Sequence, residues 1–391
     1  MAGKIKLFLD GRRNLFKRME AAIAGAENIV WFHTASYGEF EEARPVIEAT
    51  RREHPEYRIL LTFFSPSGYE PRKNWQGADW VFYLPLDTKR NTRRFLDIVR
   101  PVKAVFTIGE FWLNFLGELR KRRIDTYIMS VRVTPDSTYM KWYGHPYRKA
   151  FRSSYKCMLV QKEETAELLR GIGVPDVRIT GDPRLDRVLA IKEEDWNEPL
   201  VEKWLGGQKA FVAGSTCPKE DDDVCIELVN AHPGDKFLYV PHETYIEPIK
   251  DIISRINGRC VLYSEAEKAE NIEDAQVLII DKVGMLARLY RYGWAAFVGA
   301  GFITDEPHSV IEPAAYGLPV ATGPHYGHNL HMVELVRLGA TRGISDGKEI
   351  CNWYDEMKND PALLEKRSRA ASDYCASGRG ATDAIMKVIF Q

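Results

Sequence analysis

The sequence predicts an α/β protein with two similar domains, each built on a doubly wound parallel sheet. Its 391 residues are about two to three times the size of a typical domain. Short β-rich apolar runs alternate with longer helical patterns, and this alternation occurs in two series separated by a stretch with weak strand signals. Such a βαβα rhythm makes the strands parallel and places the helices in the crossover connections.

The first series fills the N-terminal domain, which we expect over residues 1–182. Apolar runs predict strands over 28–36, 58–64, 80–86, 103–109, 125–131 and 155–161. Between them, apolar residues at helical spacing predict helices over 39–54 and 88–100.

The second series fills the C-terminal domain, expected over 209–391, after an inter-domain segment at 183–208. Six further runs predict strands, each followed by a helical stretch: KAFVAGST, KFLYVPH, RCVLYSE, AQVLIID, AAFVGAG and LPVATGP. The last helix is a candidate to return to the N-terminal domain. We expect two Rossmann-like halves that face a cleft, with ligands bound beyond the carboxyl ends of the strands.

Composition excludes several classes of protein. With 45% apolar and 28% charged residues, 29 Gly and 20 Pro, the chain is neither disordered, collagen-like nor a small disulfide scaffold. Its six cysteines form no C-x-x-C pair, which favours reduced thiols over a disulfide framework or zinc site. No apolar run is long enough to span a bilayer, and no secretory signal is present. The basic, amphipathic N-terminus suits a membrane surface, but an ordinary surface helix is the preferred interpretation.

Charge is distributed unevenly between the two halves. Residues 1–180 contain 31 Lys/Arg and 21 Asp/Glu, a net charge of +10, which leaves −11 for residues 181–391. This asymmetry indicates an anionic partner for the first half. The stretch 88–123 has three acids against ten cations, and we favour a binding surface there: Lys89, Arg90, Arg93, Arg94, Arg100, Lys103, Arg120, Lys121, Arg122 and Arg123. Nucleic acid is not the expected partner, because the interleaved aromatics are more typical of core and cleft: Phe95, Phe106, Phe111 and Trp112.

The turn T-A-S-Y-G-E (34–39) joins the first predicted strand to a helix. Gly38 allows a tight turn, and Glu39 stands at the N-terminus of the helix. Glu39 either complements the helix dipole or acts as a general base at the mouth of the cleft.

The turn G-S-T (214–216) precedes the helix that begins in EDDDVCIELV. Ser215 and Thr216 suit a phosphate site at a helix N-terminus, or they simply cap that helix. We interpret the run Asp221–Asp223 as a solvated acidic first turn rather than as a metal motif.

A glycine-rich stretch, G-A-G-F-I-T-D-E-P-H-S-V-I-E-P-A-A-Y-G (299–317), follows another predicted strand. Ser309 and Glu312 fit a capping box for a helix that opens at Ser309. Alternatively, Glu312 binds ribose hydroxyls and His308 contacts a phosphate or carboxylate. The next motif, G-P-H-Y-G-H-N (323–329), adds His325, His328 and Asn329, but without the spacing that a metal site requires.

Eight blocks of this sequence, in order from about residue 30 to 340, resemble the Kdo transferases, the 3-deoxy-D-manno-octulosonic acid transferases of lipopolysaccharide synthesis. The blocks are H-T-A-S-Y-G-E (33–39), F-S-P-S-G-Y-E (64–70), Y-L-P-L-D (83–87), G-E-F-W-L-N (109–114), T-G-D-P-R-L-D (180–186), A-G-S-T (213–216), V-G-A-G…H-S-V-I-E-P-A-A-Y-G-L-P-V (298–320) and G-P-H…N (323–329). The seventh block includes E-P-A-A-x-G-x-P, which recurs across GT-B glycosyltransferases.

The resemblance implies an inverting GT-B enzyme that transfers Kdo from CMP-Kdo to a hydroxyl of the lipid A precursor. It also implies that the enzyme acts at the cytoplasmic face of the bacterial inner membrane, against an anionic membrane surface. Neither a metal nor another cofactor is implied. Glu39 matches the family's candidate base, and Glu110 a second acidic position. Donor-side positions implied by the resemblance are Ser215, Thr216, His242, Gly284, Met285, His308, Ser309, Glu312 and Asn329. Acceptor or membrane-side positions are Ser36, Gly38, Arg90, Arg93, Arg94 and Arg132.

The chain departs from the family pattern at several positions. The common P-R-H reads P-H-E here (241–243), so an arginine is missing, with His242 as the candidate replacement. The common G-G-H-N reads E-P-H-S (306–309), which keeps His308 and loses the asparagine. Most members have an N-terminal apolar anchor ahead of the G-R-R motif, which here is 11–13. We therefore expect peripheral membrane association, or an anchor outside this chain.

Two other functions fit the same pattern. One is a different GT-B enzyme, a transferase or an epimerase, that uses a UDP sugar, which nucleotide binding would reveal. The other is a catalytically idle homologue that binds membrane surfaces; the substituted positions motivate it, and the presence of Glu39 argues against it.

Overall fold

The computed structural model describes residues 2–391 and divides the chain into two compact units. The first comprises the chain up to Asp186 together with Gly380–Gln391, and the second comprises Arg187–Arg379. The chain therefore passes between the units twice. The predicted inter-domain segment 183–208 contains two helices, α9 (Pro183–Glu193) and α10 (Pro199–Leu205).

The first unit contains a seven-stranded parallel sheet in the order β3-β2-β1-β4-β5-β6-β7. Its strands are β1 (Ile29–Thr34), β2 (Arg58–Phe63), β3 (Trp80–Tyr83), β4 (Lys103–Thr107), β5 (Asp125–Val131), β6 (Cys157–Val160) and β7 (Val177–Ile179). Its other helices are α1 (Ala2–Asp10), α2 (Leu15–Ile23), α3 (Tyr37–Glu53), α4 (Pro66–Arg72), α5 (Lys89–Val99), α6 (Leu113–Lys121), α7 (His145–Ser154), α8 (Glu163–Gly171) and α18 (Ala381–Phe390).

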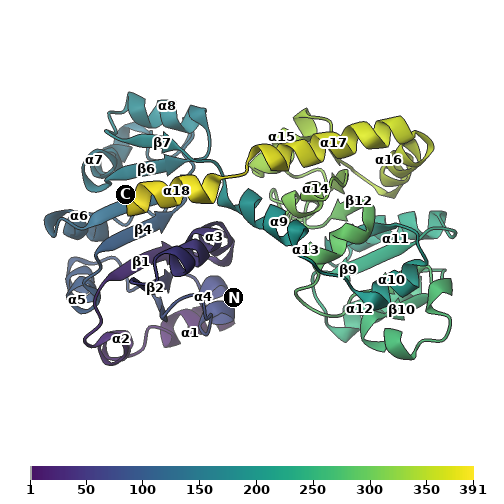
Figure 1. Cartoon of the computed structure of the whole chain (residues 1–391), viewed down its shortest axis with the longest axis horizontal. Helices are drawn as coiled ribbons and strands as arrows, with labels where there is room; N and C mark the ends of the chain where they lie inside the picture. The colour runs from purple at the N-terminus through teal and green to yellow at the C-terminus, as the bar shows by residue number, and fades with distance from the viewer. Residues whose placement is uncertain (1) are drawn as a thin grey trace. The chain divides into compact units, whose positions relative to one another are not determined.

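Helices cover both faces of this sheet. On one face, α2, α5 and α6 pack against Trp31, Leu60 and Phe106. On the other, α3 and α18 pack against Val30, Phe32 and neighbouring strand residues. In Figure 1 the yellow C-terminal helix α18 lies with the purple and blue elements of this unit, far from its neighbours in sequence. Burial on both faces explains why the strands are continuous apolar runs.

The second unit has a seven-stranded parallel sheet in the order β10-β11-β9-β8-β12-β13-β14. Its strands are β8 (Ala210–Thr216), β9 (Phe237–Pro241), β10 (Cys260–Leu262), β11 (Val277–Ile279), β12 (Gly293–Val298), β13 (Val320–Thr322) and β14 (Thr341–Gly343). Its other α-helices are α11 (Glu220–Ala231), α12 (Ile246–Arg255), α13 (Leu286–Leu289), α14 (Ile311–Ala315), α15 (Leu330–Arg337), α16 (Gly347–Asn359) and α17 (Pro361–Ser377).

All twelve predicted strands are confirmed in position, and so is the parallel, doubly wound class of each sheet. The sequence did not predict the outermost strands β7 and β14, which have only three residues each, nor helix α4. The stretch after β10 forms 3₁₀ turns over Tyr263–Lys268 instead of an α-helix.

Candidate active site

In the first sheet the strand order reverses at β1 and β4, which lie side by side in the middle of the sheet. Ligands of doubly wound sheets bind outside the carboxyl ends of the strands at such a switch point. The residues that leave these two strands, Ala35–Glu39 and Ile108–Trp112, both contain predicted site residues.

Glu39 lies in the first turn of α3, directly after β1. The backbone N–H of Ala35 donates to Glu39 Oε2 at 2.6 Å, while Oε1 has no hydrogen-bond partner within residues 2–391. The pKa of Glu39 is raised to about 8, chiefly by burial and also by the negative charges of Glu110 and Glu42. The Ala35 N–H and the positive charge of Arg132 oppose this shift. The carboxyl group is thus fixed at one oxygen, and its protonation state changes close to neutral pH.

Glu110 belongs to a chain of hydrogen bonds that reaches into the core of the unit. The indole N–H of Trp112 donates to Glu110 Oε2 at 2.7 Å, and His33 Nε2 lies 3.2 Å from the same oxygen. His33 is fully buried, with Nδ1 2.9 Å from Thr62 Oγ1. These contacts fix the Glu110 carboxylate in one orientation beside Glu39.

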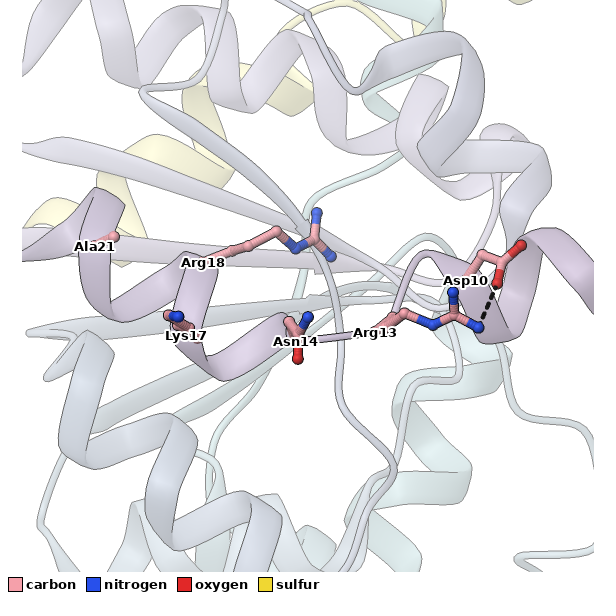
Figure 2. Close-up of a pocket in the computed structure, with 6 residues that line it drawn as sticks. All are labelled: Asp10, Arg13, Asn14, Lys17, Arg18 and Ala21. Atoms are coloured by element: carbon pink, nitrogen blue, oxygen red, sulfur yellow. Dashed lines mark ion pairs between the residues drawn. The ribbon is translucent and has the colours of Figure 1, made fainter.

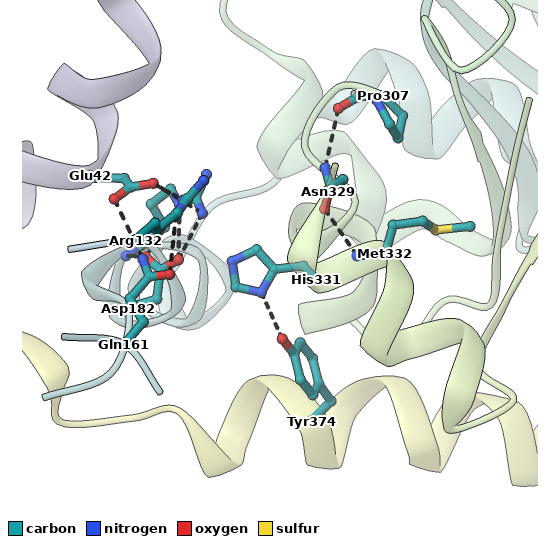
Figure 3. Close-up of polar contacts among 10 residues, drawn as sticks. Glu42, Arg132, Gln161, Asp182, Pro307, Asn329, His331, Met332 and Tyr374 are labelled. Carbon is teal, nitrogen blue, oxygen red and sulfur yellow. Dashed lines mark hydrogen bonds and ion pairs between the residues drawn. The ribbon is translucent and has the colours of Figure 1, made fainter. Parts of the chain in front are cut away.

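A second charged network lies one helical turn further along α3. Glu42 is buried and forms ion pairs with Arg132, which follows β5, and with Arg184, at 3.2 Å, in α9 (Figure 3). The buried Asp182 accepts from Arg184 Nη2 at 2.7 Å. Sequence reasoning missed Glu42, Asp182 and Arg184 as individual residues. The available signals were the E-x-x-E spacing, which puts Glu39 and Glu42 on one helix face, and the T-G-D-P-R-L-D block.

The remaining residues predicted for the acceptor side take different positions. Ser36 is the N-cap residue of α3 without a side-chain cap, and Gly38 is exposed with open space where a Cβ would be. On α5, Arg94 pairs with Glu20 at 3.0 Å and Arg93 lies 3.8 Å from Glu118, while Arg90 is exposed. Acids on neighbouring helices therefore neutralise part of the predicted basic surface.

In the second sheet the order reverses at β8 and β12, and three loops converge at their carboxyl ends. A Cβ on Gly299 would lie 2.1 Å from the Ser215 carbonyl oxygen. A Cβ on Gly301 would lie 2.7 Å from the backbone nitrogen of Gly323. Only glycine permits such close approach of two backbones, so these glycines shape the loop that the sequence predicted for the donor.

The acidic run of α11 is not a solvated face, contrary to the prediction. Asp221 and Asp222 are buried, and only Asp223 is exposed. Asp221 Oδ2 accepts from the backbone N–H groups of Cys217 and Ala300, at 2.8 and 2.7 Å. Asp222 accepts from the hydroxyl of Tyr239 at 2.6 Å. Asp221 thereby ties the loop after β8 to the loop after β12.

Ser215 and Thr216 do not cap a helix, which corrects one of their two predicted roles. Both belong to β8, and α11 begins four residues later with Lys219 as its N-cap residue. Ser215 has a left-handed backbone with φ of 53°, at an irregularity in the pairing of β8 with β9. Their phosphate-binding role stays a prediction.

His308 and His242 stack on one another, with ring centroids 4.4 Å apart. Burial, together with the neighbouring His242, lowers the pKa of His308 to about 4. The Cys217 sulfur lies 3.7 Å from His308 Nε2. His308 is therefore neutral at physiological pH, suited to hydrogen bonding rather than to ion pairing with an anion.

The predicted capping box at Ser309 and Glu312 is wrong. Helix α14 begins at Ile311, with Val310 as an N-cap residue that makes no side-chain cap. Ser309 is exposed. Burial raises the pKa of the Tyr290 phenol, and the nearby negative charge of Glu312 adds to that shift.

Asn329 caps α15, because its Oδ1 accepts from the Met332 N–H at 2.9 Å (Figure 3). Its Nδ2 donates to the Pro307 carbonyl at 3.3 Å, which connects it to the loop that contains His308. Met285 is the N-cap residue of the four-residue helix α13, and Gly284 before it has φ of 91°. The donor-side roles of these residues stay predictions.

A surface hollow of about 550 Å³ lies along α1 and α2, and none of its lining residues is a predicted site residue (Figure 2). Its lining residues are Asp10, Arg13, Asn14, Lys17, Arg18 and Ala21. Within residues 2–391, no cluster of three or more His, Cys, Asp or Glu side chains has metal-site geometry. Over the same residues no helix has the length and apolarity needed to cross a bilayer.

Comparison with known proteins shows a similarity to one family of transferases. Residues 11–187 match the family described as 3-deoxy-D-manno-octulosonic-acid transferase (kdotransferase). The chain is 28% identical to the 3-deoxy-D-manno-octulosonic acid transferase of Chlamydophila psittaci over 84% of this chain and 77% of that protein. The enzyme of the same name from Aquifex aeolicus is 26% identical, over 90% of this chain and 88% of that protein.

Solved structures with the same fold come from more distant proteins. A UDP-GlcNAc 2-epimerase from Neisseria meningitidis superposes with a TM-score of 0.63 at 14% identity, covering 93% of this chain and 99% of that one. MurG from Acinetobacter baumannii gives a TM-score of 0.56 at 9% identity, with coverage of 93% and 99%. At these identities the likeness defines the fold alone.

Two units, each with a parallel, doubly wound sheet, place the chain in the GT-B fold class. On this fold the chain is similar to the Kdo transferases, both in the family description that matches residues 11–187 and in the names of its relatives.

Proposed function

We propose that this protein transfers Kdo from CMP-Kdo to a hydroxyl of the lipid A precursor, with inversion at the anomeric carbon and Glu39 as the general base. The observation that carries the proposal is the Glu39 carboxyl group. It stands at the carboxyl edge of the sheet with one oxygen without a partner in residues 2–391 and a pKa raised to about 8.

In the reaction, Glu39 Oε1 takes the proton of the acceptor hydroxyl as its oxygen attacks the anomeric carbon of Kdo. The new C–O bond forms as the bond from that carbon to the CMP phosphate oxygen breaks, and CMP leaves with the electron pair. A carboxylate with a pKa close to the working pH is a more effective base than one with an ordinary pKa. Glu110 contributes its negative charge, which keeps the pKa of Glu39 high.

The second unit supplies the donor site. The end of β8 (Ser215 and Thr216) and the loop after β12 (Gly299–Gly301) present backbone groups at the carboxyl edge of the sheet, where a nucleotide phosphate is commonly bound. His242 stands where the family pattern has an arginine, and it stacks on His308. As a neutral imidazole, His308 can donate one hydrogen bond and accept another. Glu312 and Asn329 complete the proposed donor side.

The acceptor is a lipid, so the reaction takes place at the cytoplasmic face of the bacterial inner membrane. The net charge of +10 in residues 1–180 supports a first unit that meets an anionic acceptor and an anionic leaflet.

Incubation of the lipid A precursor with CMP-Kdo and the protein tests the proposal by mass spectrometry. The expected product is heavier by one or more Kdo residues, and CMP is released only when the acceptor is present. Release of CMP at the same rate without acceptor, or thermal stabilisation by UDP but not by CMP, would refute the assignment.

A further inference from the structure

The most exposed large apolar side chain among those described is Trp142, at 87%, and its neighbour Tyr143 is 54% exposed. The two rings pack edge to face, with centroids 5.5 Å apart. They lie on the connection between β5 and α7, which leaves the same carboxyl edge of the sheet as Glu39 and Arg132. Exposing an indole to water is costly, so an ordered exposed pair indicates an interaction surface.

The protein holds this aromatic pair in place. Arg148 donates to the carbonyl oxygens of Tyr139, Lys141 and Trp142, at 2.9, 2.6 and 3.4 Å. Tyr139 is itself anchored, because its ring packs against Phe111 at 4.7 Å. A Cβ on Gly144 would lie 2.3 Å from the Tyr139 carbonyl oxygen, so the backbone closes tightly behind the pair.

Cations outnumber acids around the pair. Between Asp136 and Glu163 the chain contains no acidic residue and six cations: Lys141, Arg148, Lys149, Arg152, Lys156 and Lys162. Two of these cations are paired with acids outside that stretch, Lys141 with Asp136 at 3.0 Å and Lys156 with Asp125 at 2.6 Å. Lys149 and Arg152 are exposed on α7, one turn apart, just after the aromatic pair. These two side chains therefore place positive charge at the surface beside Trp142 and Tyr143.

We propose that the segment 141–152 docks the first unit on a bilayer that contains anionic lipids, with Trp142 and Tyr143 in the headgroup region. Lys149 and Arg152 contact the lipid phosphates. Aromatic side chains with a polar edge prefer the membrane interface, and each nearby cation adds attraction to an anionic leaflet. The inference extends the proposed function, since docking through this edge brings lipid headgroups to the side of the sheet that bears Glu39.

Flotation of the full-length protein with vesicles tests the inference without either substrate, so its failure is distinct from failure of the proposed reaction. The vesicles are phosphatidylcholine alone or with about 30 mol% phosphatidylglycerol. Wild type is expected to float with the anionic vesicles, and W142S/Y143S should weaken that partition at least about tenfold. Lys149→Glu/Arg152→Glu should weaken it similarly, and added salt should weaken binding of wild type.

The matched control is Tyr245→Ser, which removes an aromatic side chain of 71% exposure from the second unit and should leave flotation unchanged. Vesicles with brominated acyl chains should quench part of the tryptophan fluorescence of wild type, and Trp142→Ser should lose that part. Absence of flotation, equal flotation of W142S/Y143S and wild type, or equal binding to neutral vesicles would overturn the inference.

Discussion

The surroundings of Glu39 suit both roles that the sequence left as alternatives, a carboxylate at a helix N-terminus and the general base that we propose. Its Oε2 accepts the N–H of Ala35 and so caps the start of α3, while Oε1 has no partner within residues 2–391. Capping alone would lower the pKa of a carboxyl group, because the hydrogen bond favours the charged form. Burial and the charge of Glu110 outweigh that contribution, and the pKa rises to about 8. The helix thus fixes a carboxyl group whose ionised form is costly, as a general base requires.

The pH dependence of turnover should reflect this pKa. Glu39 accepts a proton only when it is ionised, so kcat/KM should rise with pH and level off above a midpoint near 8. We expect Glu110→Gln to move that midpoint to lower pH, because it removes a negative charge that raises the pKa of Glu39. A profile already flat from pH 5 upward would contradict the assigned pKa.

Glu42 is expected to position Glu39 from one turn away. Glu42→Gln should lower kcat about tenfold, with KM for both substrates nearly unchanged, because α3 loses its ties to Arg132 and Arg184. It should also move the midpoint of the pH profile downward, since the charge of Glu42 raises the pKa of Glu39. A purely structural role would leave that midpoint in place.

The matched control is Glu48→Gln on the same helix, where a half-exposed ion pair with Arg44 spans 2.6 Å. It should cost less than about 1 kcal/mol of unfolding free energy, against about 1–3 kcal/mol for Glu42→Gln. Equal melting temperatures and equal profiles for the two variants would exclude the positioning role.

Single residues could be predicted where the evidence is local. Glu39 could be named as a candidate site residue from the sequence, because it follows a strand and a glycine turn within six residues. The burial of Asp221 could not be predicted in this way. Its partners are the backbone N–H groups of Cys217 and Ala300, and Ala300 is 79 positions away. A carboxylate in a first turn looks solvated until a distant loop covers it.

At the scale of elements, backbone strain gathers at the carboxyl ends of the central strands. Four residues other than glycine have positive φ there: Ile108 after β4, Ser130 in β5, Ser215 in β8 and Ala300 after β12. A β-branched residue such as Ile108, with φ of 57°, is costly in this region. Strain of this kind persists where surrounding structure imposes it and often coincides with functional sites.

The contact between the loops after β12 and β13 gives a test at this scale. Gly301→Ala should place a methyl group 2.5 Å from Thr322 Oγ1 and 2.7 Å from the Gly323 nitrogen. We expect the KM for CMP-Kdo to rise and the unfolding free energy to fall by about 1–3 kcal/mol. Gly234→Ala, with open space around it, is the control. Unchanged donor binding in Gly301→Ala would show that this loop does not form the donor site.

Strands and crossover helices could be predicted because a sheet covered on both faces leaves long apolar runs in the sequence. The edge strands β7 and β14 leave no such run; Arg178 and Ile179 in β7 are exposed. The helix start at Ile311 was misplaced because the S-x-x-E pattern is local, whereas His308 is held by its backbone bond to Gly299.

For the molecule as a whole, the return of α18 to the first unit connects the ends of the chain. Asp186, the last residue before the chain enters the second unit, accepts from the N–H groups of Gly380 and Thr382, each at 2.6 Å. α18 then buries Ile385 and Ile389 against the sheet face that α3 covers. The carboxylate of Asp186 thus bonds the segment that leaves the first unit to the segment that returns to it.

Asp186→Ala should therefore destabilise the first unit by about 1–2 kcal/mol, the cost of losing a helix cap. Asp383→Ala removes an exposed carboxylate from the first turn of the same helix and should cost clearly less, as it loses only the interaction with the helix dipole. Thermal unfolding of the two variants measures the difference. Equal stability would show that the Asp186 cap contributes nothing.

Charge was the one property of the whole molecule that composition alone could predict. The basic half and the acidic half follow from a residue count. Which cations stay unpaired depends on tertiary neighbours: Glu20 on another helix pairs with Arg94, and Asp125 on another strand pairs with Lys156.

The rate of the Glu39→Gln variant tests the general base most directly. With CMP-Kdo and the lipid A precursor, Glu39→Gln should lower kcat by about 10²–10⁴-fold, while its circular dichroism and CMP binding match those of wild type. Glu48→Gln should retain the wild-type rate. A Glu39→Gln enzyme that turns over within about twofold of wild type would contradict the assignment of Glu39 as the base.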